Sequence, residues 1–163
     1  MQILATLDLG SSCVVLRRAE AGDVPGIIDL IAADQLGATR DGVRTAADLA
    51  AYQAAFQAID RDPAHLLVVG LADQAIVATM QLSFLPGLAR RGALRAQIEA
   101  VRVDRAYRGC GLGSAVFTWA IGEARNRGCT LVQLTTDKSR TAAHRFYERL
   151  GFTASHEGMK LTL

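Results

Sequence analysis

Three glycines on alternate positions follow an arginine in the segment YRGCGLGS, which places Gly109, Gly111 and Gly113 after Arg108. Glycine lets the backbone adopt a positive φ and approach a ligand closely. The pattern after the glycines predicts a helix over residues 114–126, and a helix begins with unpaired N–H groups and the positive end of its dipole. These features favour a bound anion such as a diphosphate; a tight strand-to-helix turn without a ligand is the alternative.

Neither of two familiar phosphate loops fits this segment. A P-loop has Lys directly after its second glycine, but the residue five positions after Gly109 is Ser114, with no Lys beside it. A dinucleotide fingerprint needs Gly at its sixth position, which is Ser114 counted from Gly109 and Val116 counted from Gly111. The sequence also lacks the G-x-S-x-G elbow of one common type of Ser-His-Asp site.

Glu99 is the first candidate for proton transfer. It lies within an otherwise apolar run that we expect to be a strand over residues 96–103. An unpaired carboxylate is costly in such surroundings, so a catalytic base is one interpretation, and a solvated strand residue or an ion pair is the other. Strict alternation along the strand predicts that Glu99 shares a face with Val101 and Val103, opposite Ile98.

Tyr147 is the second candidate, on a predicted amphipathic helix over residues 141–150. A tyrosine can act as a general acid, although packing beside Phe146 and Leu150 is the simpler interpretation of this pattern alone. His144 is three residues before Tyr147, close enough on a helix to steer a substrate or relay a proton. A surface histidine is the favoured interpretation of His144.

The elements that must position these residues follow from apolar periodicity and turn residues. Their predicted order is strand, two helices, three strands, helix, strand, helix, and one or two final strands. The fold class is therefore α/β (α+β): a mixed, mostly antiparallel sheet of six to seven strands flanked by about four helices, with one parallel crossover late in the chain. We expect a single domain over residues 1–163. The predicted strands are 13–17, 65–71, 75–84, 96–103, 130–136 and part of 152–163. The first predicted helix starts near Pro25, and three further helices cover 46–60, 114–126 and 141–150.

Composition argues against several classes of protein. Half of the residues are hydrophobic, and the formal net charge of +2 is small for a nucleic-acid partner. Cys13, Cys110 and Cys129 form no C-x-x-C pair, and no His, Asp and Cys have the spacing of a metal site, so we expect no metal. No apolar run approaches the ~18 residues of a membrane span, and residues 1–12 lack the pattern of a signal peptide. We expect a cytoplasmic protein without a membrane partner.

The glycine loop resembles the R/Q-x-x-G-x-G/A signature of the GNAT superfamily of N-acetyltransferases, here Arg108-Gly109-Cys110-Gly111-Leu112-Gly113. A second segment, TAAHRFYERLGF over residues 141–152, is similar to the family's A-x-x-F-Y-E-x-x-G-F segment. The resemblance covers about residues 13–163 and is strongest over 96–152. It implies a GNAT-like fold, with acetyl-CoA as the co-substrate and acyl transfer as the reaction.

The resemblance also implies roles for single residues. Glu99 would accept the proton of the amine, often through water, and Tyr147 would face the sulfur of the thioester. The N–H of Val101 would polarise the acetyl carbonyl, and Val103 would pair with the pantetheine arm. Arg140 stands where many members have Asn, and we expect it to reach the phosphates of the cofactor instead. The residues expected to bind the diphosphate are Arg108, Gly109, Cys110, Gly111, Leu112, Gly113 and Ser114.

The leading function is therefore transfer of an acetyl group from acetyl-CoA directly to a primary amine of a small molecule. Acetylation of a protein or peptide, or use of a longer acyl group, is the runner-up. A non-catalytic acyl-CoA-binding module that regulates a partner is a third reading, which would require neither Glu99 nor Tyr147. Assembly as a homodimer stays open. The resemblance places the acceptor near residues 34–45 and 85–95. Asp34, Asp41 and Asp48 could bind an amine, and Arg90, Arg91 and Arg95 could bind an anionic tail, but both sets are equally well interpreted as solvated loop charges.

Overall fold

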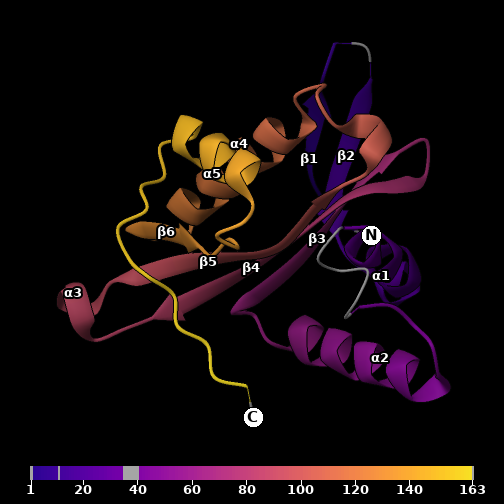
Figure 1. Ribbon diagram of the computed structural model, residues 1–163, viewed down its shortest axis with the longest axis horizontal. Coiled ribbons are helices and arrows are strands. Elements are labelled where there is room, and N and C mark those ends of the chain that lie inside the picture. Colours follow the sequence, from indigo (N-terminus) through magenta and orange to yellow (C-terminus); the bar gives the residue numbers. More distant parts are fainter. Residues whose placement is uncertain (1, 11, 35–40, 163) are drawn as a thin grey trace.

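A six-stranded sheet runs through the computed structural model, which describes residues 2–10, 12–34 and 41–162. The strands lie side by side in sequence order; all neighbours are antiparallel except β5 and β6, which are parallel (Figure 1). The predicted fold class, including the late parallel crossover, is confirmed. The strands are β1 (Ile3–Asp8), β2 (Cys13–Arg18), β3 (His65–Ala72), β4 (Ala75–Pro86), β5 (Leu94–Val103) and β6 (Leu131–Leu134).

Helices cover both faces of the sheet. The helices α1 (Val24–Ala32) and α2 (Ala46–Arg61) lie on one face, and α4 (Leu112–Asn126) and α5 (Thr141–Arg149) lie on the other (Figure 1). Three short elements complete the fold: the 3₁₀ turns η1 (Ala21–Asp23) and η2 (Arg105–Tyr107), and α3 (Ala89–Gly92) between β4 and β5. Within the described ranges, no helix is both long and apolar enough to cross a membrane.

Two apolar clusters hold these layers together, one on each face. On the α4 side, alternate residues of β4 are almost fully buried, from Ala78 through Met80 and Leu82 to Phe84, and they pack with Phe117 of α4. On the other side, Leu67 and Val69 of β3 pack with α1 and with Phe56 of α2. This alternation is the period-two pattern of a strand covered on both faces.

Two element predictions at the ends of the chain are wrong. β1 was not predicted, although it pairs with β2 from Ile3 to Asp8 through a turn at Gly10, where φ is +82°. The strands predicted within 152–163 do not form among the described residues 152–162, which are nearly all exposed. One ion pair joins this terminal segment to the turn after β6, 3.4 Å from Lys138 Nζ to Glu157 Oε1, and both side chains are largely exposed. The sheet still has six strands, because it gains β1 and lacks the expected terminal strand.

A bulge in β5 overturns the predicted alternation around Glu99. Arg102 and Glu99 are three residues apart, but they pair with Thr79 and Gln81 of β4, which are two apart. The extra residue is absorbed at Ala100, whose φ of +51° costs about 1–2 kcal/mol for a residue with a side chain. Directly opposed residues share a face of the sheet, so Glu99 and Arg102 lie on the face opposite the α4 cluster.

The same bulge turns the following valines the other way. Val103 pairs with Ala78, and both Val101 and Val103 pack against the α4 cluster that contains Ile98. Glu99 therefore does not share a face with Val101 and Val103, contrary to the prediction. The extra residue shifts every later side chain of β5 by one position.

Candidate functional site

The sheet opens between β5 and β6 directly before the bulge of β5. β6 pairs with β5 only from Arg95 to Ile98, so the rest of that edge of β5 has no neighbouring strand among the described residues. A small cleft of about 60 Å³ lies at this opening. Four predicted site residues line it together, namely Glu99, Val101, Arg140 and Tyr147, and the other lining residues are Ile98, Ala100, Arg102, Phe117, Leu134, Thr135 and Thr136.

The glycine loop sits where α4 begins. Gly109 and Gly111 have φ values of +82° and +89°, and a Cβ atom built on either would meet nothing within 4 Å. Gly111 is the N-cap of α4, and no side chain caps this end of the helix. The first helical hydrogen bond, 3.0 Å from Ala115 N to Gly111 O, leaves the N–H groups of Leu112 to Ser114 without intrahelical partners. Open space above free N–H groups suits an anion.

Gly113 has a different purpose in the loop. A Cβ atom here would lie 3.6 Å from Cζ of Phe146 on α5, an ordinary van der Waals distance, so Phe146 of α5 lies directly beside the start of α4. One turn further along α4, the ring of Phe117 lies 5.4 Å from that of Tyr147. The start of α4 and the cleft therefore belong to one continuous region.

Two hydrogen bonds hold the loop to the end of β5. Arg108 Nε donates to the carbonyl oxygen of Val103 over 3.3 Å, and Cys110 Sγ donates to the carbonyl oxygen of Tyr107 over 2.9 Å. The thiol of Cys110 is thus turned back onto its own loop, and Cys110 does not line the cleft. The predicted diphosphate-binding roles of these residues remain predictions.

Tyr147 stands among aromatic rings that fix its position. Its ring centroid lies 5.4 Å from that of Phe117, 5.5 Å from that of Phe146 and 6.1 Å from that of Phe152. Burial raises the pKa of Tyr147, although the positive charges of Arg140 and Arg102 oppose this effect. A tyrosine whose pKa lies above its ordinary value of about 10 is protonated at neutral pH, so it can donate a proton.

Arg140 is engaged with a carboxylate at the cleft. Its Nη2 atom lies 3.3 Å from Asp34 Oδ1, and Arg102 Nη2 lies 3.5 Å from Asp34 Oδ2. Asp34, expected near the acceptor, is thus paired with two arginines and is only 9% exposed. The phosphate contact predicted for Arg140 stays a prediction.

Glu99 is exposed at the edge of the cleft, opposite Gln81 of β4. His144, weighed as a relay, has its Nε2 atom 3.0 Å from the carbonyl oxygen of Asp137. No group of three or more His, Cys, Asp or Glu with the geometry of a metal site is found in the described part of the chain.

Other charged residues that were considered for binding the acceptor lie at a helix cap or in an exposed turn. Asp48 accepts hydrogen bonds from the N–H groups of Arg44 and Thr45 at the start of α2, and this capping lowers the pKa of Asp48. Arg90 and Arg91 lie in the exposed α3 turn with positive φ values. The middle of the predicted acceptor segment, residues 35–40, lies outside the described residues.

Sequence reasoning missed two features of the cleft. Arg102 was predicted only to lie on a strand, with no functional role. Thr136 was predicted only to lie at the end of a strand that is rich in β-branched residues. Thr136 Oγ1 is buried with no hydrogen-bond partner among the described residues, although it lines the cleft. Such an atom offers a hydrogen bond to a molecule that enters the cleft. Neither residue carries a sequence signal, because the splaying of β5 from β6 creates the opening.

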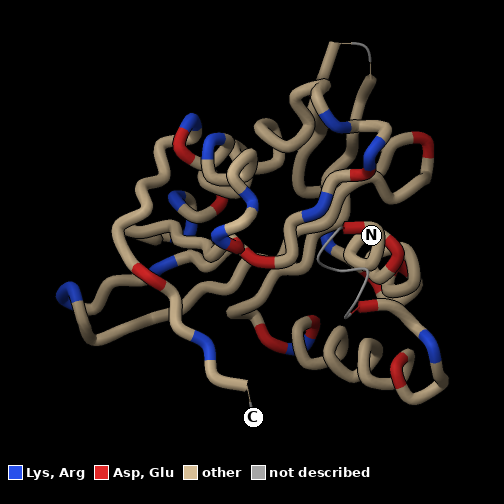
Figure 2. Tube along the Cα trace, in the orientation of Figure 1, with Lys and Arg blue, Asp and Glu red and all other residues tan. Residues whose placement is uncertain are grey.

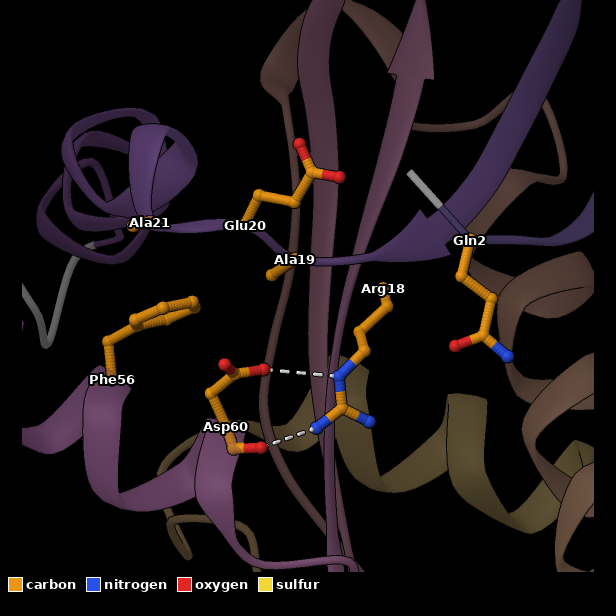
Figure 3. Close-up of a pocket in the computed structure, with 7 residues that line it drawn as sticks. All are labelled: Gln2, Arg18, Ala19, Glu20, Ala21, Phe56 and Asp60. Carbon is orange, nitrogen blue, oxygen red and sulfur yellow. Dashed lines mark hydrogen bonds and ion pairs between the residues drawn. The ribbon is translucent and has the colours of Figure 1, made fainter.

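A larger cavity of about 350 Å³ lies away from these residues, beside α2 and the end of β2. Figure 3 shows Arg18 and Asp60 turned toward each other, with Arg18 Nε 3.2 Å from Asp60 Oδ1, while the carboxylate of Glu20 points away from them. Phe56 forms part of the wall, and no predicted catalytic or cofactor-binding residue is present. Basic and acidic positions are interspersed along the whole trace, without a long stripe of one sign (Figure 2).

Comparison with known proteins gives a family match. The sequence model of the Acetyltransferase (GNAT) family matches residues 32–152. Glucosamine 6-phosphate N-acetyltransferase of Trypanosoma brucei brucei is 38% identical over 88 residues, or 54% of this chain and 58% of that protein. Aminoalkylphosphonate N-acetyltransferase of Salmonella typhimurium is 42% identical over 60 residues, or 37% of this chain and 39% of that protein. The matches thus span less than two thirds of each of these relatives.

Solved structures match over more of the chain. A transcriptional regulator from Bacillus halodurans C-125 is 43% identical with a TM-score of 0.87, and the match covers 92% of this chain and 99% of that one. A putative acetyltransferase from Agrobacterium tumefaciens str. C58 is 32% identical with a TM-score of 0.78, covering 91% and 99%. A predicted acetyltransferase from Clostridium acetobutylicum, described with acetyl-CoA, is 17% identical with a TM-score of 0.72 over 91% and 96%, and it shares the fold.

Proposed function

Because the chain belongs to the acetyltransferase (GNAT) family, we propose that it transfers an acetyl group from acetyl-CoA directly to a primary amine of a small molecule. The observation that carries the proposal is the gap between β5 and β6. It brings Glu99, Val101 and Tyr147 to one cleft, next to an uncapped helix start. A simple binding module would need the helix start but neither of the two proton-transfer groups.

The residues present fit acetyl-CoA. The space above Gly109 and Gly111 admits a diphosphate close to the free N–H groups at the start of α4. The unpaired edge of β5 after Ile98 offers backbone groups to an extended amide chain such as pantetheine, as an added strand would use them. Thr136 Oγ1 offers a further hydrogen bond inside the cleft.

The proposed reaction uses three groups of the chain. The thioester supplies an activated acetyl group; its C–S bond breaks as the C–N bond of the amide forms. Glu99 accepts the proton of the amine, directly or through a water, because an alkylammonium with a pKa near ~10.4 is unreactive at neutral pH. The N–H of Val101 donates a hydrogen bond to the acetyl oxygen as negative charge develops there. Tyr147 gives its proton to the departing sulfur and regains one from solvent.

A small acceptor is favoured by the named relatives. Both the glucosamine 6-phosphate and the aminoalkylphosphonate enzymes are named for small amines that carry an anionic phosphorus group. We therefore propose a small primary amine over a protein or peptide.

A screen of acceptors tests the proposed function. Thiol release from acetyl-CoA would be measured with each of four kinds of acceptor: amino sugar phosphates, aminoalkylphosphonates, other small amines and peptides. The acetylated product would be identified by mass spectrometry. The proposal expects an acetylated small amine. Acetylation of peptides alone would establish the runner-up, and binding of CoA without turnover of any amine would establish the regulatory module.

Tyr147→Phe is expected to lower kcat while acetyl-CoA affinity stays nearly unchanged, because the lost hydroxyl serves the departing sulfur and not the diphosphate. The loss should stay below the ~10²-fold typical of a positioned acid or base, since a thiolate of pKa near ~8.5 is already a fair leaving group. Steady-state kinetics and calorimetry with CoA would measure the two effects. Tyr52→Phe, on α2, is the control for loss of a phenol elsewhere, and normal turnover by Tyr147→Phe would leave Tyr147 a packing residue.

Cys110→Ala is expected to keep most of the activity, because direct transfer needs no acylated enzyme and this thiol is bonded to the carbonyl oxygen of Tyr107. Mass spectrometry of the protein after brief exposure to acetyl-CoA should find no acyl group on Cys110. An acyl-cysteine that forms and decays as fast as product appears would refute direct transfer.

A further inference from the structure

Asp34, Arg102 and Arg140 form an ion cluster at the cleft, which the reaction above does not use. The three residues come from different elements: Asp34 follows α1, Arg102 lies just past the bulge of β5, and Arg140 is the N-cap of α5. The carboxylate of Asp34 lies 3.3 Å from Arg140 Nη2 and 3.5 Å from Arg102 Nη2. The side chains of Asp34 and Arg102 are each only 11% exposed.

The cluster contacts the backbone of the proposed site on one side. Arg102 Nη1 donates a hydrogen bond of 2.8 Å to the carbonyl oxygen of Val101, directly after the bulge. Asp34 Oδ2 has no hydrogen-bond partner among the described residues, so it attracts this guanidinium as an ion pair at 3.5 Å, and the guanidinium in turn braces the residue whose N–H we assign to the acetyl oxygen. Since Ala100 has a positive φ, this part of β5 needs such bracing to keep its shape.

On the other side, the cluster holds the start of α5, the helix that carries Tyr147. Two hydrogen bonds from Ser139 to Asp137 Oδ1, of 2.9 and 2.6 Å, shape the turn that leads into Arg140. The ion pair with Asp34 then ties this turn to the end of α1 across the cleft.

The charges of the cluster reach the phenol of Tyr147. Burial raises the pKa of Tyr147, Arg140 and Arg102 lower it, and Asp34 raises it. The other titratable group that lines the cleft is Glu99 on β5, while β6 and the turn after it contribute Leu134 and two threonines, which do not titrate. His144, on the same helix, is bonded to the carbonyl oxygen of Asp137.

We propose that Asp34 is a positioning residue, a clamp that holds Arg102 at the bulge of β5 and, through Arg140, holds the start of α5, so that one net positive charge faces Tyr147. This inference rests on the proposed function for its chemical purpose. When Tyr147 has given its proton to the sulfur, it carries a negative charge beside two guanidinium groups. The cluster stabilises this phenolate without touching the acceptor, and Asp34, with its carboxylate engaged by both arginines, does not bind the amine.

The test compares Asp34→Asn, Arg140→Gln and Arg140→Lys in the full chain. Phenolate formation would be followed by ultraviolet absorbance against pH, with the signal of Tyr147 obtained by subtracting the Tyr147→Phe variant. Arg140→Gln removes a positive charge, so it should raise the pKa of Tyr147 by roughly one unit, the effect of one nearby charge. Asp34→Asn removes the negative charge and should lower that pKa. Arg140→Lys should restore the value of the unaltered protein.

Opposite shifts for the two charge-removing variants are the result that supports the clamp. A mere loss of packing would hydrate Tyr147 in both variants and lower its pKa in both, and this outcome or the absence of any shift would overturn the proposal. Should Asp34→Asn not fold, as judged by circular dichroism, the Gln and Lys variants at the half-exposed Arg140 still decide the question.

Kinetics separate this inference from the proposed function. Arg140→Gln should lower kcat roughly tenfold, in step with a one-unit pKa change, and a rise in KM for acetyl-CoA would report the separate phosphate contact predicted for Arg140. Opposite pKa shifts with unchanged turnover would refute the acid role of Tyr147 and with it the purpose of the clamp. Parallel shifts with normal acetyl transfer would refute the clamp alone.

Discussion

Glu99→Gln is expected to lower kcat for acetyl transfer near neutral pH by roughly 10²-fold or more, the usual scale for a positioned general base. The side chain is exposed at the edge of the cleft, where it can meet an amine entering from solvent. Glutamine has nearly the same volume but cannot accept the proton, so the fold should be kept. The loss should shrink as pH rises toward the amine pKa of ~10.4, because more of the amine is already neutral.

The measurement is kcat against pH for the unaltered protein and the variant, with CoA affinity measured separately. Glu123→Gln is a matched control, since Glu123 lies on α4, pairs with Arg127 at 2.7 Å and is absent from the cleft. It should leave kcat unchanged. Full activity of Glu99→Gln across neutral pH would assign the base role to water or to His144.

Gly111→Val is expected to weaken CoA binding at least tenfold, which is ~1.4 kcal/mol. The φ of Gly111 is +89°, and the space beside its Cα is open, so a branched side chain would stand where the diphosphate must approach. Isothermal titration calorimetry with CoA measures the effect, and thermal unfolding reports the cost of the strained backbone.

Gly128→Val separates strain from obstruction. Gly128, at the other end of α4, also has a positive φ, +77°, and open space around its Cα. Its substitution should destabilise the fold to a similar extent and leave CoA affinity intact. If folded Gly111→Val bound CoA as well as the unaltered protein does, the assignment of the glycine loop to the diphosphate would fail.

Local signals in the sequence were sufficient for much of the fold. The helix predicted over residues 114–126 does end at Asn126, and Gly128 follows with a positive φ and the 2.9 Å bond from Cys129 N to Ala124 O that closes such helix ends. β3, β4 and β5 were recognised because each contains a run of apolar residues, which is typical of a strand. The segment from Arg108 to Ser114 was identified as a loop leading into a helix because of its three alternate glycines. Two of them, Gly109 and Gly111, do adopt a positive φ.

The missed features depend on contacts distant in sequence or on one extra residue in a strand. The prediction of which side chains share a face assumed a regular strand. The single bulge at Ala100 moved both Val101 and Val103 to the face opposite Glu99. The pair of Asp34 and Arg140 joins residues 106 positions apart, so no local pattern could predict it. β1 was missed because residues 1–12 were considered only as a targeting signal.

A crystal structure of the protein with CoA tests the central claim most directly. We expect the diphosphate over the N–H groups of Leu112, Gly113 and Ser114, with the pantetheine arm along the free edge of β5 and its sulfur near Tyr147. Occupancy of the larger cavity beside Arg18 and Asp60, with the opening between β5 and β6 left empty, would contradict the account.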